Sequence, residues 1–280
     1  MAATLTQEQR ALVLEAVRAA SRARILPRFR ALTPDMIATK SGPIDLVTVA
    51  DREAEADIAA AVRAGWPEAA VAGEESVAAD ASLRALMGTA DPCVVIDPID
   101  GTWNFANGLS TFGVLVAVLR GGRPAWGLLY DPLLDDWMEA GGDGPATFAD
   151  ARGRRLALST SREARPSRLT GFVTLGLHRK EDRPAIAATF PSFLRVSTLR
   201  CAVHEYRMVA QGSAEFMLSG PTPHPWDHAA GCLVVERAGG VARFLDGSPY
   251  DAARRKGTLL VAGSEEAWRG LAATFSFLSR

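Results

Sequence analysis

Residues 94–102, VVIDPIDGT, carry the strongest structural signal in the chain. Their apolar start predicts a buried strand that ends at Asp97, where the following proline stops it. Gly101 permits a tight turn, so Asp97 and Asp100 should meet at the edge of a sheet with the hydroxyl of Thr102 beside them. Adjacent carboxylates repel each other unless a cation neutralises them, and hard oxygen ligands favour Mg²⁺ or Ca²⁺ over zinc.

Acidic residues stand at the ends of predicted elements in three further stretches. Glu74 and Glu75 follow a short apolar strand and a glycine, Asp227 opens a helix, and Asp51 starts another helix. At a helix start, free N–H groups and the helix field favour an anion or a bound phosphate. Taken one at a time, these acids also fit ordinary roles as turn residues, a solvated pair or helix N-caps.

Together, four motifs resemble the inositol monophosphatase family of metal-dependent, lithium-sensitive phosphatases. They are KSGPIDLVTVAD (40–51), GEES (73–76), DPIDGTWNF (97–105) and PWDHAAG (225–231), in that order along the chain. The resemblance covers roughly residues 40–245. It implies an α/β fold, a layered αβαβα sandwich of the sugar-phosphatase type, formed by a single domain at 1–280 with two lobes at about 1–150 and 151–280. It also implies a homodimer.

The resemblance implies a metal centre built from acids of three motifs and one carbonyl. Glu74, Asp97 and the backbone carbonyl of Ile99 resemble the ligands of a first Mg²⁺. Asp97, Asp100 and Asp227 resemble those of a second, and Glu74 would also touch a third, weaker ion. We therefore expect two to three ions in one site.

The same resemblance assigns the catalytic and phosphate-binding groups. Asp51 and Thr102 match the pair that polarises the attacking water, Glu74 joins them as a catalytic residue, and the N–H groups of Gly101 and Thr102 match a phosphate cradle. Metal ions lower the pKa of bound water, so in-line attack on a phosphate ester needs no side-chain nucleophile. The expected activity is that of a Mg²⁺-dependent phosphoric monoester hydrolase acting on a small phosphorylated metabolite.

The alcohol end of the site departs from the family pattern. Trp103 replaces a small polar residue, Arg200-Cys201-Ala202 stands where inositol phosphatases have a Gly-Ser/Thr-Ala turn, and Ser219 stands where they have a glutamate. We take Trp103, Arg200 and Ser219 as candidate substrate contacts. The substrate stays open between inositol 1-phosphate or a related sugar or polyol phosphate, fructose bisphosphate, histidinol phosphate and a 3′(2′),5′-bisphosphate nucleotide. The roles of His204, Glu205 and the proline-rich stretch 221–225 also stay open.

Three rival interpretations fit the residues less well. A haloacid-dehalogenase-type phosphatase needs its two aspartates two residues apart, whereas Asp97 and Asp100 are three apart. The GGDG at 141–144, which resembles a nucleotide-kinase loop, is followed by proline and is better interpreted as a turn. A non-catalytic binding protein for phosphorylated metabolites on the same fold has no use for the pair Asp51 and Thr102.

Bulk properties exclude other classes. The chain has 31 basic and 32 acidic residues and a net charge near −1, so nothing indicates binding to nucleic acid or an anionic membrane. The longest apolar run, 112–119, is too short to span a bilayer, and the N-terminus lacks a secretory signal pattern. The three cysteines form no CxxC pair, which favours reduced, buried thiols and a cytoplasmic protein.

Local patterns give the expected elements. We expect helices at 5–29, 50–66, 202–211, 227–238 and 264–278, the last capped by Ser264. We expect strands at 93–97, 111–119, 124–130, 136–140, 168–174, 214–218, 241–245 and 258–262, and a polar loop at 38–48.

Overall fold

The computed structural model describes residues 5–42 and 45–279. Residues 1–4, part of the stretch without a signal pattern, and 43–44, part of the expected polar loop, lie outside the described residues. The helices are α1 (Gln7–Ala20), α2 (Val49–Gly65), α3 (Glu74–Ala79), α4 (Leu86–Thr89), α5 (Thr102–Ala106), α6 (Arg183–Thr189), α7 (Ala202–Ala210), α8 (Pro225–Arg237) and α9 (Glu265–Thr274).

The strands form a hairpin and two sheets. They are β1 (Ile37–Gly42), β2 (Asp45–Thr48), β3 (Ala70–Gly73), β4 (Cys93–Asp100), β5 (Gly113–Arg120), β6 (Arg123–Asp131), β7 (Asp136–Gly141), β8 (Thr147–Asp150), β9 (Arg155–Ala157), β10 (Thr170–Val173), β11 (Arg195–Ser197), β12 (Phe216–Leu218), β13 (Val241–Phe244) and β14 (Leu259–Ala262). The seven-stranded sheet follows chain order from β3 to β9, with only the β3–β4 pair parallel. The five-stranded sheet has the order β11-β10-β12-β14-β13.

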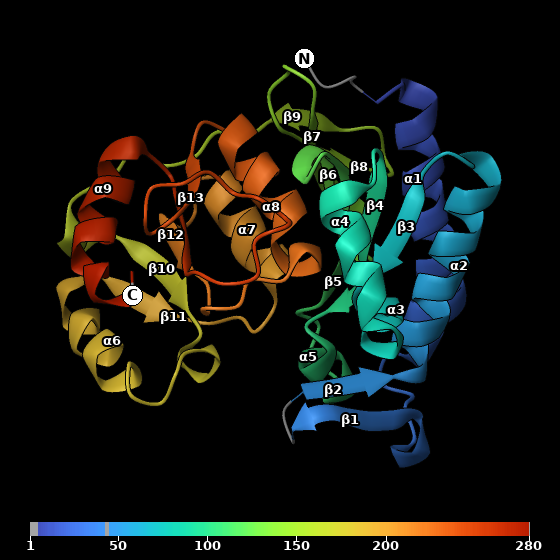
Figure 1. The fold of residues 1–280 in the computed structure, drawn as a ribbon, viewed down its shortest axis with the longest axis horizontal. Coiled ribbons are helices and arrows are strands. Elements are labelled where there is room, and N and C mark those ends of the chain that lie inside the picture. The colour runs from blue at the N-terminus through green and yellow to red at the C-terminus, as the bar shows by residue number, and fades with distance from the viewer. Residues whose placement is uncertain (1–4, 43–44, 280) are drawn as a thin grey trace.

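Helices and sheets alternate in layers, as Figure 1 shows. The α1–α2 pair covers one face of the seven-stranded sheet, α7 and α8 lie between the two sheets, and α6 and α9 cover the outer face of the five-stranded sheet. Both faces of the large sheet are therefore covered, which explains why β4 and β5 are continuous apolar runs rather than alternating ones. The expected αβαβα sandwich is confirmed.

The two halves are held together by a buried ion pair at the centre of the molecule. Arg207 on α7 donates to Asp136 of β7 over 2.5 Å and to the carbonyl of Leu129 on β6 over 3.1 Å. The large sheet ends at Ala157 and the smaller one begins at Thr170. We keep the division into two lobes near residue 150 as a proposal.

Several expected elements differ from the structure. The polar loop at 38–48 is wrong in its described part, because β1 and β2 pair there as an antiparallel hairpin. The first helix ends at Ala20 and continues as a π turn at Ser21–Ile25 and a 3₁₀ turn at Leu26–Arg28, where proline is tolerated. The last helix ends at Thr274, and its predicted cap is confirmed by the bond from the Ala267 N–H to Ser264 Oγ.

Two simpler expectations are also settled. Cys93, Cys201 and Cys232 are all buried and free of disulfides, as expected for reduced thiols. Among the described residues, no helix combines the length and apolar character needed to cross a membrane.

Candidate active site

Strand β4 brings Asp97 and Asp100 to its C-terminal end. Contrary to expectation, Pro98 does not stop the strand; pairing with β5 continues to Asp100, with a register shift between the two aspartates. Within that irregular segment the N–H of Ile99 donates to Asp97 Oδ1 over 3.1 Å. Gly101 then adopts a φ of 83°, which glycine tolerates and which turns the chain into α5.

The predicted acids from three segments are close enough to repel one another. Burial raises the pKa of Asp97 well above its usual value, and the charges of Glu74, Asp100 and Asp227 raise it further. Burial, then Glu74 and Asp100, likewise raise the pKa of Asp227, although a side-chain hydrogen bond with Asp97 opposes this. The four acids therefore lie close enough for their charges to act on one another.

A lysine occupies part of this acidic cluster. Lys40 Nζ lies 2.6 Å from Glu74 Oε1 and 2.5 Å from Glu75 Oε1. Burial alone would lower the pKa of Lys40, but these two carboxylates raise it above its usual value. Within residues 5–42 and 45–279, no three His, Cys, Asp or Glu side chains are placed to ligate one ion as they stand. The carboxylates instead take other partners, of which Lys40 is one.

Asp100 takes its partners from the other half of the molecule. Its Oδ2 accepts a hydrogen bond from the N–H of Val203 over 2.5 Å and from the thiol of Cys201 over 3.1 Å, at the start of α7. The free N–H groups of a helix start suit a carboxylate. Nearby, His204 Nε2 lies 3.1 Å from the carbonyl oxygen of Phe112, so this nitrogen carries the proton in that contact.

Glu74 is positioned by an acid that the sequence analysis did not single out. Glu55, buried on α2, accepts hydrogen bonds from the N–H groups of Glu75 and Ser76, over 2.7 and 2.9 Å, at the start of α3. A side chain at Gly73 would collide with the Glu55 carboxylate, because an added Cβ would lie 2.4 Å from it. Glu74 therefore lies at the start of α3 and not at the end of a strand. Gly73 was the feature of the sequence that could have indicated the close approach of Glu55.

Asp51 is the third residue of α2 and closes its capping box. Its Oδ2 accepts from the N–H of Thr48 over 2.8 Å and from the Thr48 hydroxyl over 2.5 Å. The hydroxyl of Thr102 lies 3.0 Å from Asp51 Oδ1 and 2.9 Å from the carbonyl oxygen of Ile99. Burial raises the pKa of Asp51 to about 7. Asp51 therefore caps α2 and also contacts Thr102.

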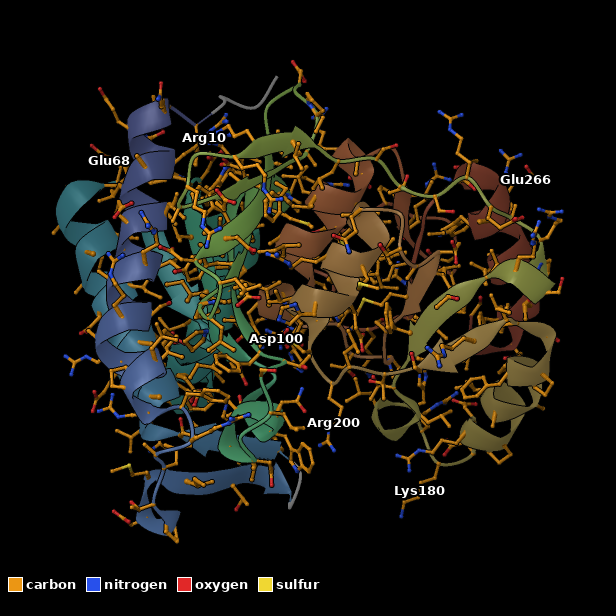
Figure 2. The ribbon with its side chains drawn as sticks, turned by 180° about the vertical axis from the view of Figure 1, so that it is seen from behind. Arg10, Glu68, Asp100, Lys180, Arg200 and Glu266 are labelled. Atoms are coloured by element: carbon orange, nitrogen blue, oxygen red, sulfur yellow. The ribbon has the colours of Figure 1, made fainter. Side chains whose placement is uncertain are left out.

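The three candidate substrate contacts divide into two groups. The guanidinium of Arg200 stacks on Trp103, with its central carbon 3.9 Å from the ring centre. Figure 2 shows Arg200 and Asp100 in the region where the two halves of the molecule meet. Ser219 is instead buried, and its hydroxyl donates to the Gly220 carbonyl over 2.8 Å and accepts from the Leu259 N–H over 2.8 Å. Because both bonds are internal, we assign Ser219 a structural role and withdraw it as a substrate contact.

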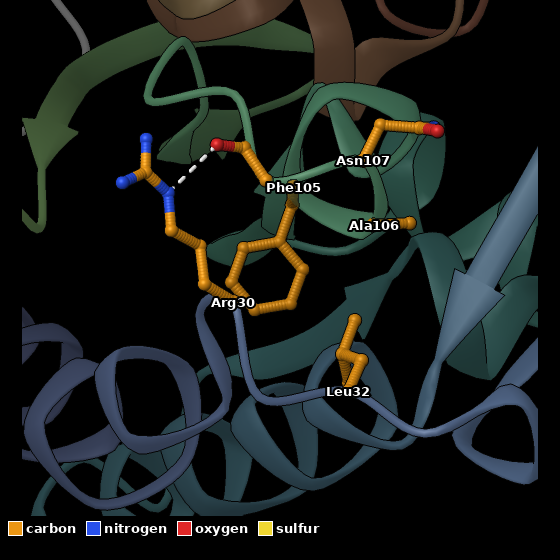
Figure 3. A pocket seen from close by; sticks show the side chains of 6 residues that line it. Arg30, Leu32, Phe105, Ala106 and Asn107 are labelled. Carbon is orange, nitrogen blue, oxygen red and sulfur yellow. Dashed lines mark hydrogen bonds between the residues drawn. The ribbon is translucent and has the colours of Figure 1, made fainter.

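A separate cavity lies at the far end of α5 and contains none of the predicted site residues. It encloses about 380 Å³, and the Arg30 Nε–Gly108 carbonyl bond of 3.0 Å crosses one side of it (Figure 3). Its lining residues are Arg30, Leu32, Phe105, Ala106, Asn107 and Gly108.

A layered αβαβα sandwich with an acid cluster at the end of strand β4, beside the edge strand β3, is the arrangement expected of a class of metal-dependent phosphatases. Comparison with known proteins places the chain within it: the model of the inositol monophosphatase family matches residues 7–279. The chain belongs to this family, and it is a phosphoric monoester hydrolase.

Individual relatives agree with this placement. Inositol monophosphatase 1 of Sus scrofa is 30% identical over 241 residues, covering 82% of this chain and 81% of the relative. The Nus factor SuhB of Escherichia coli is 34% identical over 248 residues, covering 84% and 86%. A solved IMPase/NADP phosphatase, complexed with Mg²⁺ and phosphate, has a TM-score of 0.78 at 18% identity, covering 96% and 95%, and shows the shared fold.

Proposed function

We propose that this protein is a Mg²⁺-dependent phosphomonoesterase that hydrolyses a small phosphorylated metabolite with a metal-activated water. The observation that carries the proposal is the cluster of buried, mutually repelling carboxylates beside the Asp51–Thr102 contact. A cluster of this kind is unfavourable in a protein without a cation or proton to neutralise it.

The donor set suits Mg²⁺. All four candidate side-chain ligands are carboxylates, and the carbonyl of Ile99 is a fifth oxygen donor: Glu74, Asp97, Ile99, Asp100 and Asp227. Two to three ions sharing these groups would offset the repulsion that raises the pKa of Asp97. The bound Mg²⁺ and phosphate of the solved IMPase/NADP phosphatase support the choice of ion. When bound, Mg²⁺ lowers the pKa of a coordinated water and stabilises charge on the phosphate and leaving oxygens.

Asp51 and Thr102 are the groups that would handle the proton of the attacking water. With a pKa near 7, Asp51 can exchange a proton close to neutral pH, which suits a general base. The Thr102 hydroxyl has one proton, which it can donate to Asp51 or to the Ile99 carbonyl, so its oxygen is left to accept a hydrogen bond from the attacking water. Glu74 joins this pair as a catalytic residue in the proposal.

The turn at Gly101 is the proposed phosphate cradle, with the N–H groups of Gly101 and Thr102 as donors. No side chain fits at Gly101, because an added Cβ would lie 3.0 Å from the Thr111 carbonyl oxygen and 3.2 Å from Cys201 Cβ. The glycine therefore lets this turn pack closely against Cys201 in the second half of the molecule and leaves the backbone N–H groups accessible to a phosphate.

For the substrate we propose inositol 1-phosphate or a related sugar or polyol phosphate. Fructose bisphosphate, histidinol phosphate and a 3′(2′),5′-bisphosphate nucleotide are the alternatives within the family. From the family we also propose a homodimer, inhibition by lithium and a cytoplasmic location. The likeness to a Nus factor keeps a binding role without catalysis as the rival outcome.

A phosphate-release assay on a panel of these metabolites tests the proposal. We expect release with Mg²⁺, loss of release with EDTA, and loss in Asp97→Asn at matched protein concentration. The exposed Lys180→Gln serves as the control variant, because Lys180 lies in the second half of the molecule, away from Asp100 (Figure 2). Release that persists in EDTA, or in Asp97→Asn with Mg²⁺, would contradict the proposed metal centre.

A further inference from the structure

Arg200 occupies a strained position beside the turn that carries the proposed phosphate cradle. Its φ of 53° lies in the left-handed region, which is unfavourable for a residue other than glycine. The surrounding structure holds it there: its N–H donates to Thr198 Oγ1 over 3.1 Å, and Asn104 Nδ2 donates to the neighbouring Leu199 carbonyl over 2.8 Å. An added Cβ at Gly101 would lie 3.3 Å from the Arg200 carbonyl oxygen. The backbone of Arg200 is thus fixed against that turn.

The side chain of Arg200 is a half-buried cation whose hydrogen-bonding edge is unused. Its guanidinium carbon lies over the Trp103 ring, 3.9 Å from the ring centre, and among the described residues no carboxylate pairs with it and no acceptor receives its side-chain N–H groups. A guanidinium carries five N–H donors in its plane, so stacking on the indole occupies its face and leaves the donors free. By contrast Arg207, on α7, donates side-chain hydrogen bonds to Asp136 and to the carbonyl of Leu129.

Trp103 places this cation next to the reacting end of the site. It follows Thr102 directly on α5, and Thr102 contacts Asp51. A substrate whose ester phosphate lay at the turn of Gly101 and Thr102 would extend toward groups adjoining that turn. Trp103 adjoins it in sequence, and Arg200 adjoins it in space. A neutral polyol offers this guanidinium no charge, whereas a second anionic group would bind it bidentately.

We propose that Trp103 and Arg200 select substrates that carry a second anionic group, either another phosphate or a carboxylate, on the alcohol released by hydrolysis. This inference rests on the proposed function and, among its candidate substrates, favours those that carry a second anionic group, such as a bisphosphate, over inositol 1-phosphate. The stacked indole fixes the guanidinium plane, and the N–H edge of Arg200 receives the second anion while the ester phosphate lies at the cradle.

Two matched substrate pairs test the proposal and separate the two sources of charge. Myo-inositol 1-phosphate against myo-inositol 1,4-bisphosphate adds a phosphate, and glycerol 2-phosphate against 2-phosphoglycerate adds a carboxylate. With Mg²⁺, we expect kcat/KM to favour the charged member of at least one pair by about tenfold or more. The pair in which the charged substrate is favoured shows whether the second anion is a phosphate or a carboxylate.

Three variants locate the effect. In Arg200→Gln the preference for the charged substrate should fall at least tenfold, mainly through KM. Arg200→Lys should restore part of the preference, because lysine keeps the positive charge but lacks the bidentate donor geometry of the guanidinium. Arg84→Gln is the matched comparison, since Arg84 stacks on Trp226, next to Asp227, and also lacks a carboxylate partner among the described residues. Arg195→Gln, an exposed change on β11, is the distant control.

The outcomes separate this inference from the proposed function. Hydrolysis without preference in either pair, or a preference lost in Arg84→Gln but kept in Arg200→Gln, overturns the role of Arg200. An equal loss on both members of a pair in Arg200→Gln also overturns it, because Arg200 would then serve the ester phosphate itself. Absence of Mg²⁺-dependent release from all four substrates and from p-nitrophenyl phosphate contradicts the proposed function, and this inference falls with it.

Discussion

Thr102 and Asp51 meet with 3.0 Å between the threonine hydroxyl and Asp51 Oδ1, although 51 residues separate them in the chain. The contact joins the start of α5 to the start of α2, and Thr48 fixes the other oxygen of Asp51 through two hydrogen bonds. The Asp51 carboxylate therefore caps α2 and also contacts the Thr102 hydroxyl, which is proposed to orient the attacking water. Its capping role and its proposed chemical role can be separated by substitution.

Asp51→Asn should keep the helix cap but lose the base. The amide oxygen can still accept from Thr48, so the unfolding midpoint should move little, whereas kcat should fall about 10²–10⁴-fold. Steady-state kinetics with saturating Mg²⁺ and thermal unfolding measure the two effects. Thr48→Val is the converse control, expected to destabilise α2 by about 1 kcal/mol with a smaller loss of kcat. Similar kcat values for Asp51→Asn and wild type would refute the base assignment.

Asp97→Asn should change stability in opposite directions with and without metal. In EDTA the substitution removes a buried charge that repels Glu74, Asp100 and Asp227, so we expect a gain of about 1–3 kcal/mol. With Mg²⁺ the wild type should gain from ion binding and the variant should gain much less. Urea unfolding in both buffers measures this. A variant less stable than wild type in EDTA would show that repulsion at Asp97 is not a significant cost.

Lys40→Gln should lower the Mg²⁺ concentration needed for activity. The ammonium lies 2.6 Å from Glu74, so it competes with a divalent cation for the same carboxylate. Removing its charge should reduce half-saturating Mg²⁺ several-fold, both in activity and in Mg²⁺-dependent thermal shift. Lys180→Gln, on exposed surface, should leave the titration unchanged. A higher Mg²⁺ requirement in Lys40→Gln would instead indicate that Lys40 helps to bind substrate.

The local chemistry of residues 94–102 made one end of the site predictable. An apolar run and a glycine determine where Asp97 and Asp100 lie, because strand burial and turn formation depend on neighbours in sequence, whereas the effect expected of Pro98 was wrong. The contact between Asp51 and Thr102 depends on how the helices pack against the sheet. The spacing of residues along the chain could not predict it. The family resemblance paired the two residues by their expected role and gave no contact between them.

The missed features share a polar, locally ambiguous sequence. Glu55 stands in an Ala/Glu-rich helix and fits the pattern of a solvated face, yet it is buried and caps α3. Lys40 lies in β1, whose Thr, Lys, Ser and Gly residues give no apolar alternation, so the pattern predicted a loop instead of a strand. Ser219 was predicted to be a substrate contact from its position before the motif PWDHAAG, whereas its burial indicates a structural role.

The buried pair of Arg207 and Asp136 should be a major determinant of stability. Both side chains are almost inaccessible, and Asp136→Ala would leave a buried guanidinium whose one remaining partner among the described residues is the Leu129 carbonyl. We expect a loss of about 3–5 kcal/mol, measured by urea unfolding, because breaking one side of a buried pair leaves an uncompensated charge. Arg154→Ala, which breaks an exposed pair with Asp150, should cost at most about 1 kcal/mol. Equal losses in the two variants would be inconsistent with this ranking.

Glu205 should make stability depend on pH in a window between about 4.5 and 7. Burial raises its pKa from 4.5 to about 7, while its Oε1 accepts from the Leu199 N–H over 2.7 Å and the Thr198 hydroxyl over 3.1 Å. Below pH 7 the folded state binds a proton that the unfolded state takes up only near 4.5, so falling pH favours the folded state. Glu205→Gln removes this titration and keeps the acceptor oxygen.

The stability of the wild type relative to Glu205→Gln should therefore rise by roughly 2–4 kcal/mol between pH 8 and pH 4.5, since one pKa unit corresponds to about 1.4 kcal/mol. Paired urea unfolding at pH 8, 7, 6 and 5 measures the difference, in which all other titrating groups largely cancel. Above pH 7 the wild type carries the full cost of the buried carboxylate, so the variant should be the more stable protein there. A difference that stays constant over this range would mean that Glu205 keeps an ordinary pKa despite its burial.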